Sequence, residues 1–278
     1  MIINQTIDQF QDLDLLAVLS VSSNNNDFLL FGQNPHGYQL FTYDVKMNSV
    51  QLKQQTSALK SPTYNVYSPV SYDFERNTVH FQMNPMWTNG LGIMSIDFDN
   101  HLNTFVTLQN SSVILTNCFY DQDSHVFYSS YIDINASMNV APYDTRGQEK
   151  LRPFNLTLDF ILLDKYYGYQ SIYIYRSKLF VIVGSMSPGF PLWMGAIDLD
   201  SMEMSTIFLE QSMIVGNNDL VGWRPDSIDL EHGRISLYAV VYPDNTKSYL
   251  YMVDLFTLSY TKTSMLLNLS NGMDWTIM

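Results

Sequence analysis

A short strand-like segment that ends in aspartate recurs five times along this chain of 278 residues, and no other feature of the sequence constrains the fold as strongly. The segments end at Asp44, Asp97, Asp144, Asp198 and Asp254, roughly 47 to 56 residues apart, a spacing typical of supersecondary units that stack on one another. In every copy, a large apolar residue lies four positions before the aspartate and another lies one position before it. The repeat therefore predicts one structural unit copied five times.

A second strand-like segment lies about 16 to 19 residues upstream of each aspartate, and its apolar residues alternate. The alternating pairs are Phe28 and Leu30, Val79 and Phe81, Val126 and Tyr128, Leu179 and Val181, and Ile235 and Leu237. Because neighbouring residues of a strand point to opposite faces of a sheet, each pair lies on one face. A third strand is predicted after each aspartate and a fourth before each upstream turn. The sequence thus predicts five antiparallel meanders of four strands between about residue 13 and residue 268.

This pattern resembles the blades of β-propeller repeat proteins, in which four-stranded sheets pack face to face. The resemblance implies an all-β fold, a five-bladed β-propeller of four-stranded antiparallel blades, with residues 1–278 as a single domain. A six-bladed propeller, with one blade assembled from both termini, is the alternative. Residues 1–7 and 273–278 read as extra strand-like pieces, and we expect at least one of them to pair across the junction, because an unpaired sheet edge is exposed to association.

The charge of the chain limits its partners. The net charge is -13, and only 15% of the residues are charged. An acidic surface is repelled by nucleic acid and by anionic membranes, so neither is an expected partner. No run approaches the roughly 18 apolar residues that a membrane-spanning helix needs, so no membrane insertion is predicted. With 46% hydrophobic residues, the chain has ample material for a core.

The sequence leaves the cellular compartment open. Its single cysteine, Cys118, excludes an internal disulfide and fits a cytoplasmic setting. The first ten residues lack the basic and apolar regions of a signal peptide. Glycosylation sequons at Asn4, Asn110, Asn135, Asn155 and Asn268 favour a secreted or cell-surface protein if a leader was removed.

Residues with catalytic or metal-binding chemistry do not form a recognisable site in the sequence. The repeated aspartates are interpreted as turn residues whose carboxylates accept backbone N–H groups, because a catalytic residue is not expected in every copy. The pairs Asp97 with Asp99 and Asp198 with Asp200 have oxygen ligands suited to Ca²⁺ but lack the further ligands of a calcium loop. The histidines show no metal-ligand spacing. We therefore predict no catalytic residue, no metal and no cofactor.

One stretch, QMNPMWTNG at residues 82–90, resembles a fragment of the invertase-type glycosidase signature, Trp-Met-Asn-Asp-Pro-Asn-Gly. That family has a nucleophilic aspartate directly before the proline, whereas Asn84 stands before Pro85 in this chain. An amide does not serve as the nucleophile or general base of glycoside hydrolysis. The stretch is therefore predicted to be a loop between two strands.

Large side chains in the corresponding loops predict a binding face. Trp87, Trp193 and His36 fall in loops between the second and third strands of their units, and Trp223 falls in a connection between units. In a propeller these loops share one rim, where an aromatic ring stacks on a sugar or anchors a protein partner. We predict a non-catalytic binding module for protein or glycan that uses this rim. The alternative is a divergent propeller glycoside hydrolase with carboxylate catalysis.

Overall fold

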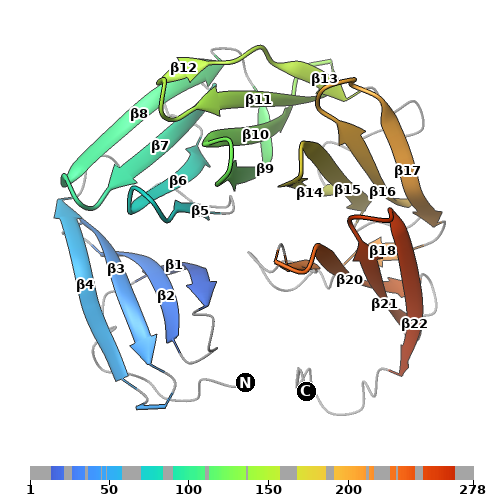
Figure 1. The fold of residues 1–278 in the computed structure, drawn as a ribbon, viewed down its shortest axis with the longest axis horizontal. Coiled ribbons are helices and arrows are strands. Elements are labelled where there is room, and N and C mark those ends of the chain that lie inside the picture. Colours follow the sequence, from blue (N-terminus) through green and yellow to red (C-terminus); the bar gives the residue numbers. More distant parts are fainter. Residues whose placement is uncertain are drawn as a thin grey trace. The chain divides into compact units, whose positions relative to one another are not determined.

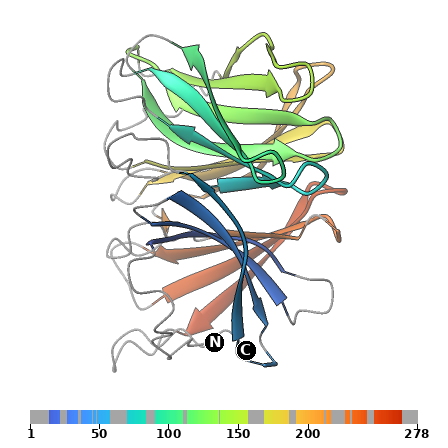
Figure 2. The ribbon, with the colours of Figure 1, turned by 90° about the vertical axis from the view of Figure 1, so that its left-hand side faces the viewer.

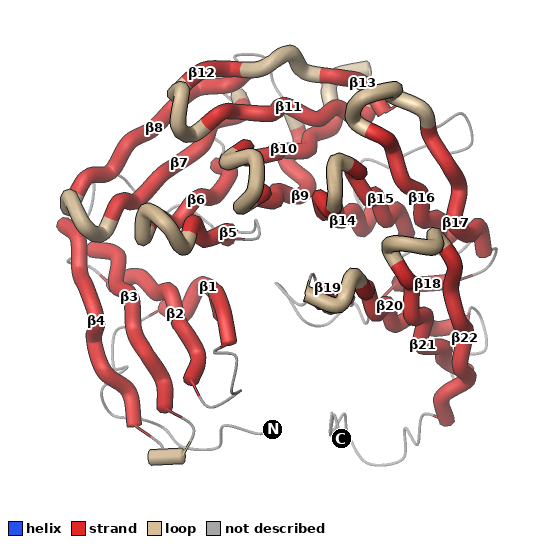
Figure 3. The backbone as a smooth tube through the Cα atoms, in the orientation of Figure 1, coloured by secondary structure: helices blue, strands red, loops and turns tan. Residues whose placement is uncertain are grey.

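The computed structural model describes residues 14–21, 27–34, 37–44, 46–47, 49–57, 70–83, 90–109, 113–135, 137–156, 168–185, 191–210, 213–215, 226–229, 231–241 and 247–266. Every regular element within these ranges is a β-strand, and none is a helix (Figure 3). It follows that the described residues include no helix with the length and apolar character to cross a membrane.

The first three sheets follow one another along the chain (Figure 1). The first contains β1 (Asp14–Val21), β2 (Asp27–Asn34), β3 (Gly37–Asp44) and β4 (Ser49–Ser57). The second contains β5 (Val70–Asp73), β6 (Thr78–Met83), β7 (Leu91–Asp97) and β8 (Leu102–Gln109). The third contains β9 (Ile114–Asp121), β10 (Val126–Ile132), β11 (Met138–Asp144), β12 (Glu149–Lys150) and β13 (Phe154–Leu156).

Two further sheets complete the described chain. The fourth contains β14 (Gly168–Tyr175), β15 (Lys178–Ser185), β16 (Leu192–Asp198) and β17 (Met204–Glu210). The fifth contains β18 (Met213–Val215), β19 (Asp226–Asp229), β20 (Arg234–Val241), β21 (Lys247–Asp254) and β22 (Ser259–Leu266). The fold is therefore all-β, a five-bladed β-propeller of four-stranded antiparallel blades, as the repeat predicted.

The two five-stranded sheets keep the four-strand plan, because in each of them one strand is split. In the third sheet, β12 and β13 both pair with β11 and together make the fourth strand. Pro153 lies in the break, and proline has no N–H to donate to a strand ladder. In the fifth sheet, β18 and β19 both pair with β20 and together make the first strand.

The chain packs as two compact units. Unit 1 consists of Met1–Ser129 and Ala141–Pro153, and unit 2 consists of Ser130–Val140 and Phe154–Met278. The single domain expected from the sequence stays a prediction. Residues 1–7 and 273–278, at least one of which was expected to pair across the junction, lie outside the described residues.

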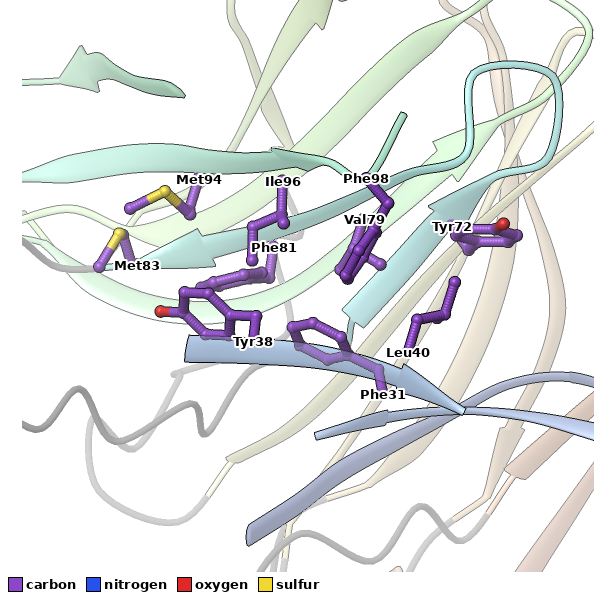
Figure 4. Close-up of a cluster of buried hydrophobic side chains, with 10 residues drawn as sticks. All are labelled: Phe31, Tyr38, Leu40, Tyr72, Val79, Phe81, Met83, Met94, Ile96 and Phe98. Atoms are coloured by element: carbon purple, nitrogen blue, oxygen red, sulfur yellow. The ribbon is translucent and has the colours of Figure 1, made fainter. Parts of the chain in front are cut away.

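Unit 1 buries an aromatic core between its first two sheets. The β1–β4 sheet fans out through the twist that is usual for strands (Figure 2). Phe31 stacks on Tyr38 with ring centroids 5.6 Å apart and lies 6.2 Å from the ring of Phe81. Val79 and Met83 join Phe81 on the same face of β6 (Figure 4). The alternation seen in the sequence thus places one face of β6 against the preceding blade.

The five repeated aspartates hold turns, as the sequence predicted. In each copy the aspartate Oδ1 atom accepts a backbone N–H from two or three residues later, at 2.8 to 3.1 Å. In four copies the residue four positions after the aspartate adopts a left-handed backbone, with φ between 53° and 60°. These residues are His101, Gln148, Met202 and Leu258. A left-handed non-glycine residue is costly, and the carboxylate hydrogen bonds help to offset that cost.

Asp198 predicts a loss of stability in acid. The backbone N–H of Ser201 and the ammonium group of Lys178, 3.0 Å away, lower its pKa to about 2. A carboxyl group with a lowered pKa stabilises the fold above its unfolded pKa, near 4, and that contribution disappears as the pH falls through about 2. We expect Asp198→Asn to melt at a lower temperature than the parent at pH 5, with the difference closing by pH 2.

The measurement is the melting temperature of both proteins across this pH range. Lys178→Gln serves as the control, because it removes the cation and keeps the carboxylate in its turn. It is expected to lose part of the same pH dependence. A difference between Asp198→Asn and the parent that stays constant from pH 5 to pH 2 would contradict the assignment.

Candidate functional site

The second face of β6 is polar, although it is buried as completely as the first. His80 and Gln82 lie on this face with exposed fractions of 3% and 2%. They pack against β9 and against Phe127 and Ser129 of β10, all within unit 1. We call the group formed by these two residues and their polar neighbours the polar seam; it consists of Asp73, His80, Gln82, Ser95, Tyr120, His125 and Ser129.

A chain of hydrogen bonds crosses the polar seam through Asp73. The Tyr120 hydroxyl donates to Asp73 Oδ2 at 2.7 Å and lies 3.1 Å from Nδ1 of His125. Asp73 Oδ1 accepts the backbone N–H groups of Glu75 and Arg76 at 3.0 and 3.2 Å. Asp73 is fully buried, and the three hydrogen bonds that it accepts, from the Tyr120 hydroxyl and the two backbone N–H groups, supply what a buried carboxylate needs. The carboxylate therefore joins the β5–β6 turn to strand β9.

At the exposed end of the polar seam, an ion pair and hydrogen bonds join neighbouring turns. Arg146 donates to Glu75 at 2.5 Å, and the same carboxylate lies 3.8 Å from Nε2 of His125. Arg76 donates from Nη1 to the carbonyl of Thr145 at 3.0 Å. These contacts link the β5–β6 turn to the β11–β12 turn, in the same unit as the carboxylate chain.

Burial favours the neutral forms of His80 and Tyr120. Desolvation lowers the pKa of His80 to about 4, with Asp73 opposing and Arg76 reinforcing the shift. Desolvation and the hydrogen bond to Asp73 raise the pKa of Tyr120 well above its usual value. At neutral pH His80 is uncharged and Tyr120 keeps its proton. This arrangement is suited to holding two blades together, because a phenol with a raised pKa stays protonated, and the protonated hydroxyl donates a hydrogen bond but is a poor nucleophile.

Sequence reasoning missed the polar seam. The notable signal was the Thr78-Val79-His80-Phe81-Gln82-Met83 alternation, in which polar residues share one strand face. In an exposed strand that face meets water, whereas a blade inside a propeller buries both faces. The seam was predictable only by combining the alternation with the position of this strand inside a blade.

Trp193 is the one residue of the predicted binding face that lies within the described ranges. The sequence placed it in a loop, whereas the structure places it in strand β16 with an exposed fraction of 0%. Its Nε1 donates to Thr206 Oγ1 on β17 at 3.2 Å. The ring of Trp193 is buried inside unit 2 and its N–H is hydrogen-bonded there, so we leave Trp193 out of the proposed binding face. His36, Trp87 and Trp223 lie outside the described residues.

A glycine explains how Trp193 fits into the sheet. Gly195 lies two residues later, on the same face of β16, and the six-membered ring of the indole covers it. A Cβ at position 195 would collide with that ring. The pair at i and i+2 in one strand was a readable sign of core packing, since glycine in a strand often marks a close approach.

Two of the carboxylates considered for Ca²⁺, Asp97 and Asp99, accept hydrogen bonds from amide groups. Asp97 accepts the backbone and side-chain N–H groups of Asn100 at 2.9 and 2.8 Å. Asp99 accepts Nδ2 of Asn77 at 2.6 Å and Nε2 of Gln54 at 3.3 Å, which lowers its pKa. Across the described ranges, no three His, Cys, Asp or Glu side chains gather as a metal would require.

Comparisons with known proteins support the β-propeller fold. No protein-family model matches the chain, and no curated protein sequence matches it. The β-propeller domain of the Trilobed protease from Pyrococcus furiosus is similar over 94% of this chain and 72% of its own, with TM-score 0.52 and 12% identity. An oligogalacturonate lyase in complex with manganese is similar over 91% and 67%, with TM-score 0.56 and 10% identity. Hydrazine synthase from Kuenenia stuttgartiensis is similar over 98% and 71%, with TM-score 0.58 and 10% identity. At such identities these likenesses show the β-propeller fold alone.

Proposed function

We propose that this protein is a non-catalytic binding module that holds a protein or glycan with the loop rim of its propeller. The observation that carries the proposal is that the repeated aspartates are hydrogen-bonded within the scaffold. The five turn aspartates accept backbone N–H groups, and the buried Asp73 accepts a tyrosine and two more backbone groups. Carboxylates committed to the scaffold in this way support a rigid platform for loops.

In the β5–β8 sheet, the connection that carries Trp87 is longer than the turn at the other end of β6. In unit 1, a turn of four residues joins β5 to β6, whereas seven residues, 84–90, join β6 to β7 and include Trp87. Binding residues occur preferentially on longer loops that a rigid scaffold positions. Tryptophan offers a large ring face and an N–H donor, which suit a sugar ring or an apolar pocket on a protein partner. His36 and Trp223 extend the proposed face.

The test is a binding comparison between the parent, Trp87→Ala and Phe74→Ala. Phe74 is the matched control, because it is an aromatic residue with an exposed fraction of 57% at the opposite end of β6. A glycan array and an affinity pull-down identify a ligand for the parent. Trp87→Ala is then expected to lose roughly 2 kcal/mol or more of binding free energy, as interface hot spots do, while melting close to the parent.

Phe74→Ala is expected to bind as the parent does. Equal binding by the parent and Trp87→Ala would remove this rim from the proposal. Turnover of a bound glycan by the parent would favour the alternative, a divergent glycoside hydrolase, over a binding module.

A further inference from the structure

Two buried nitrogen atoms of the polar seam have no hydrogen-bond partner among the described residues. They are Nε2 of His80 and Nε2 of Gln82. Both side chains are at least nine-tenths buried, so bulk water does not reach them. An unpaired polar group in such a place costs about 1–3 kcal/mol, and native proteins usually satisfy it with an ordered water.

Both side chains lie on the same face of β6, and the other polar atom of each is already hydrogen-bonded. Nδ1 of His80 lies 2.8 Å from Oγ of Ser95 on β7. Nε2 is the other ring nitrogen, and the imidazole ring packs against the rings of Tyr120 on β9 and Phe127 on β10, with centroids 5.1 and 6.0 Å away. Oε1 of Gln82 accepts the hydroxyl of Ser129 on β10 at 2.5 Å, so the Gln82 amide also meets the next blade.

The spacing of the two residues matches a single bridging molecule. His80 and Gln82 are separated by two positions on one strand face, which places their backbones about 6–7 Å apart. A molecule that makes two hydrogen bonds of about 2.9 Å spans up to about 6 Å between the atoms it joins. One small molecule is therefore sufficient to reach both nitrogens.

The chemistry of the pair selects a neutral molecule that both donates and accepts. Gln82 Nε2 is a donor only, so it repels a cation. His80 Nε2 is a donor in one neutral tautomer and an acceptor in the other. Water accepts from Gln82 and meets either tautomer of His80, whereas an anion such as chloride fits only the tautomer with a proton on Nε2.

We infer that the polar seam holds one internal water molecule, hydrogen-bonded to His80 Nε2 and Gln82 Nε2, as an integral part of the packing of β6 against β9 and β10. This water completes the hydrogen bonds of a face that would otherwise bury two unpaired groups. It also lets the blades of unit 1 meet through a polar contact on one side of β6 and an aromatic contact on the other.

A crystal structure of the parent in chloride-free buffer tests the inference directly. We expect a density peak within about 2.7–3.2 Å of both nitrogens, the range of ordinary hydrogen bonds. In Gln82→Met, which keeps the side-chain length and removes the donor, the peak is expected to be lost. In the control Ser95→Ala, which removes only the partner of His80 Nδ1, the peak is expected to remain.

Solution measurements cover the case in which a variant does not fold. In the parent, the side-chain amide protons of Gln82 should show a rotating-frame Overhauser cross-peak with water that marks a long-lived bound molecule. The absence of both the density and this cross-peak in the parent would overturn the inference. A bromide soak that gives an anomalous peak at the site would also overturn it, because the occupant would then be an anion.

Discussion

Replacing Trp193 with alanine is expected to destabilise the protein by about 3–5 kcal/mol, the usual cost of deleting a large aromatic side chain from a core. Trp193 has an exposed fraction of 0%, and its ring lies over Gly195 inside the β14–β17 sheet. The substitution leaves a cavity and removes the donor to Thr206. The free energy of unfolding, measured by urea titration with circular dichroism of the strands, reports the effect.

Leu209→Ala is the matched control for Trp193→Ala. Leu209 pairs with Trp193 across the β16–β17 ladder, but its side chain has an exposed fraction of 47%. Its removal is expected to change the stability by well under half as much, because the exposed part of the side chain contributes no burial. If Trp193→Ala unfolds at the same urea concentration as the parent, the burial described for Trp193 is wrong.

Replacing Asp73 with alanine is expected to cost roughly 3 kcal/mol of unfolding free energy. The substitution leaves the buried Tyr120 hydroxyl without its acceptor and releases two backbone N–H groups of the β5–β6 turn. Both losses weaken the packing of β5 against β9 within unit 1. Urea titration of the parent and the variant at pH 7 provides the measurement.

Asp144→Ala is the control for Asp73→Ala, because it removes turn hydrogen bonds without removing a contact to Tyr120. Asp144 also accepts two backbone N–H groups through Oδ1, those of Arg146 and Gly147, but no tyrosine donates to it. Its loss is expected to cost on the order of 1 kcal/mol, the net worth of such hydrogen bonds. Equal losses for Asp73→Ala and Asp144→Ala would show that the Tyr120 contact contributes nothing.

Tyr120→Phe completes a double-mutant cycle with Asp73→Ala. The phenylalanine keeps the aromatic volume and removes the hydroxyl that Asp73 accepts. Because the two residues share one hydrogen bond, the double variant is expected to lose less than the sum of the single losses. Strict additivity would contradict the proposed coupling.

The sequence by itself determined the class of the fold and the role of its repeated acids. Strand periodicity and hairpin turns depend on residues close in sequence. The residues of each copy therefore predict the strands and turns of that copy independently of the rest of the chain. The Asp198 turn shows this, because the hydrogen bonds to Asp200 and Ser201 join residues within one short segment. Even the break between β12 and β13 has a local cause in Pro153.

Only the tertiary structure decided which side chains meet. Trp193 read as a loop residue because the beginning of β16 depends on pairing with β15 and β17, which are distant in sequence. His80 and Gln82 read as an ordinary polar face because alternation tells which residues share a face and says nothing of what that face packs against. The Asp73–Tyr120 bond joins residues 47 positions apart. The physical reason is that a strand face is buried only when an adjacent blade packs against it, and the residues of that blade lie elsewhere in the sequence.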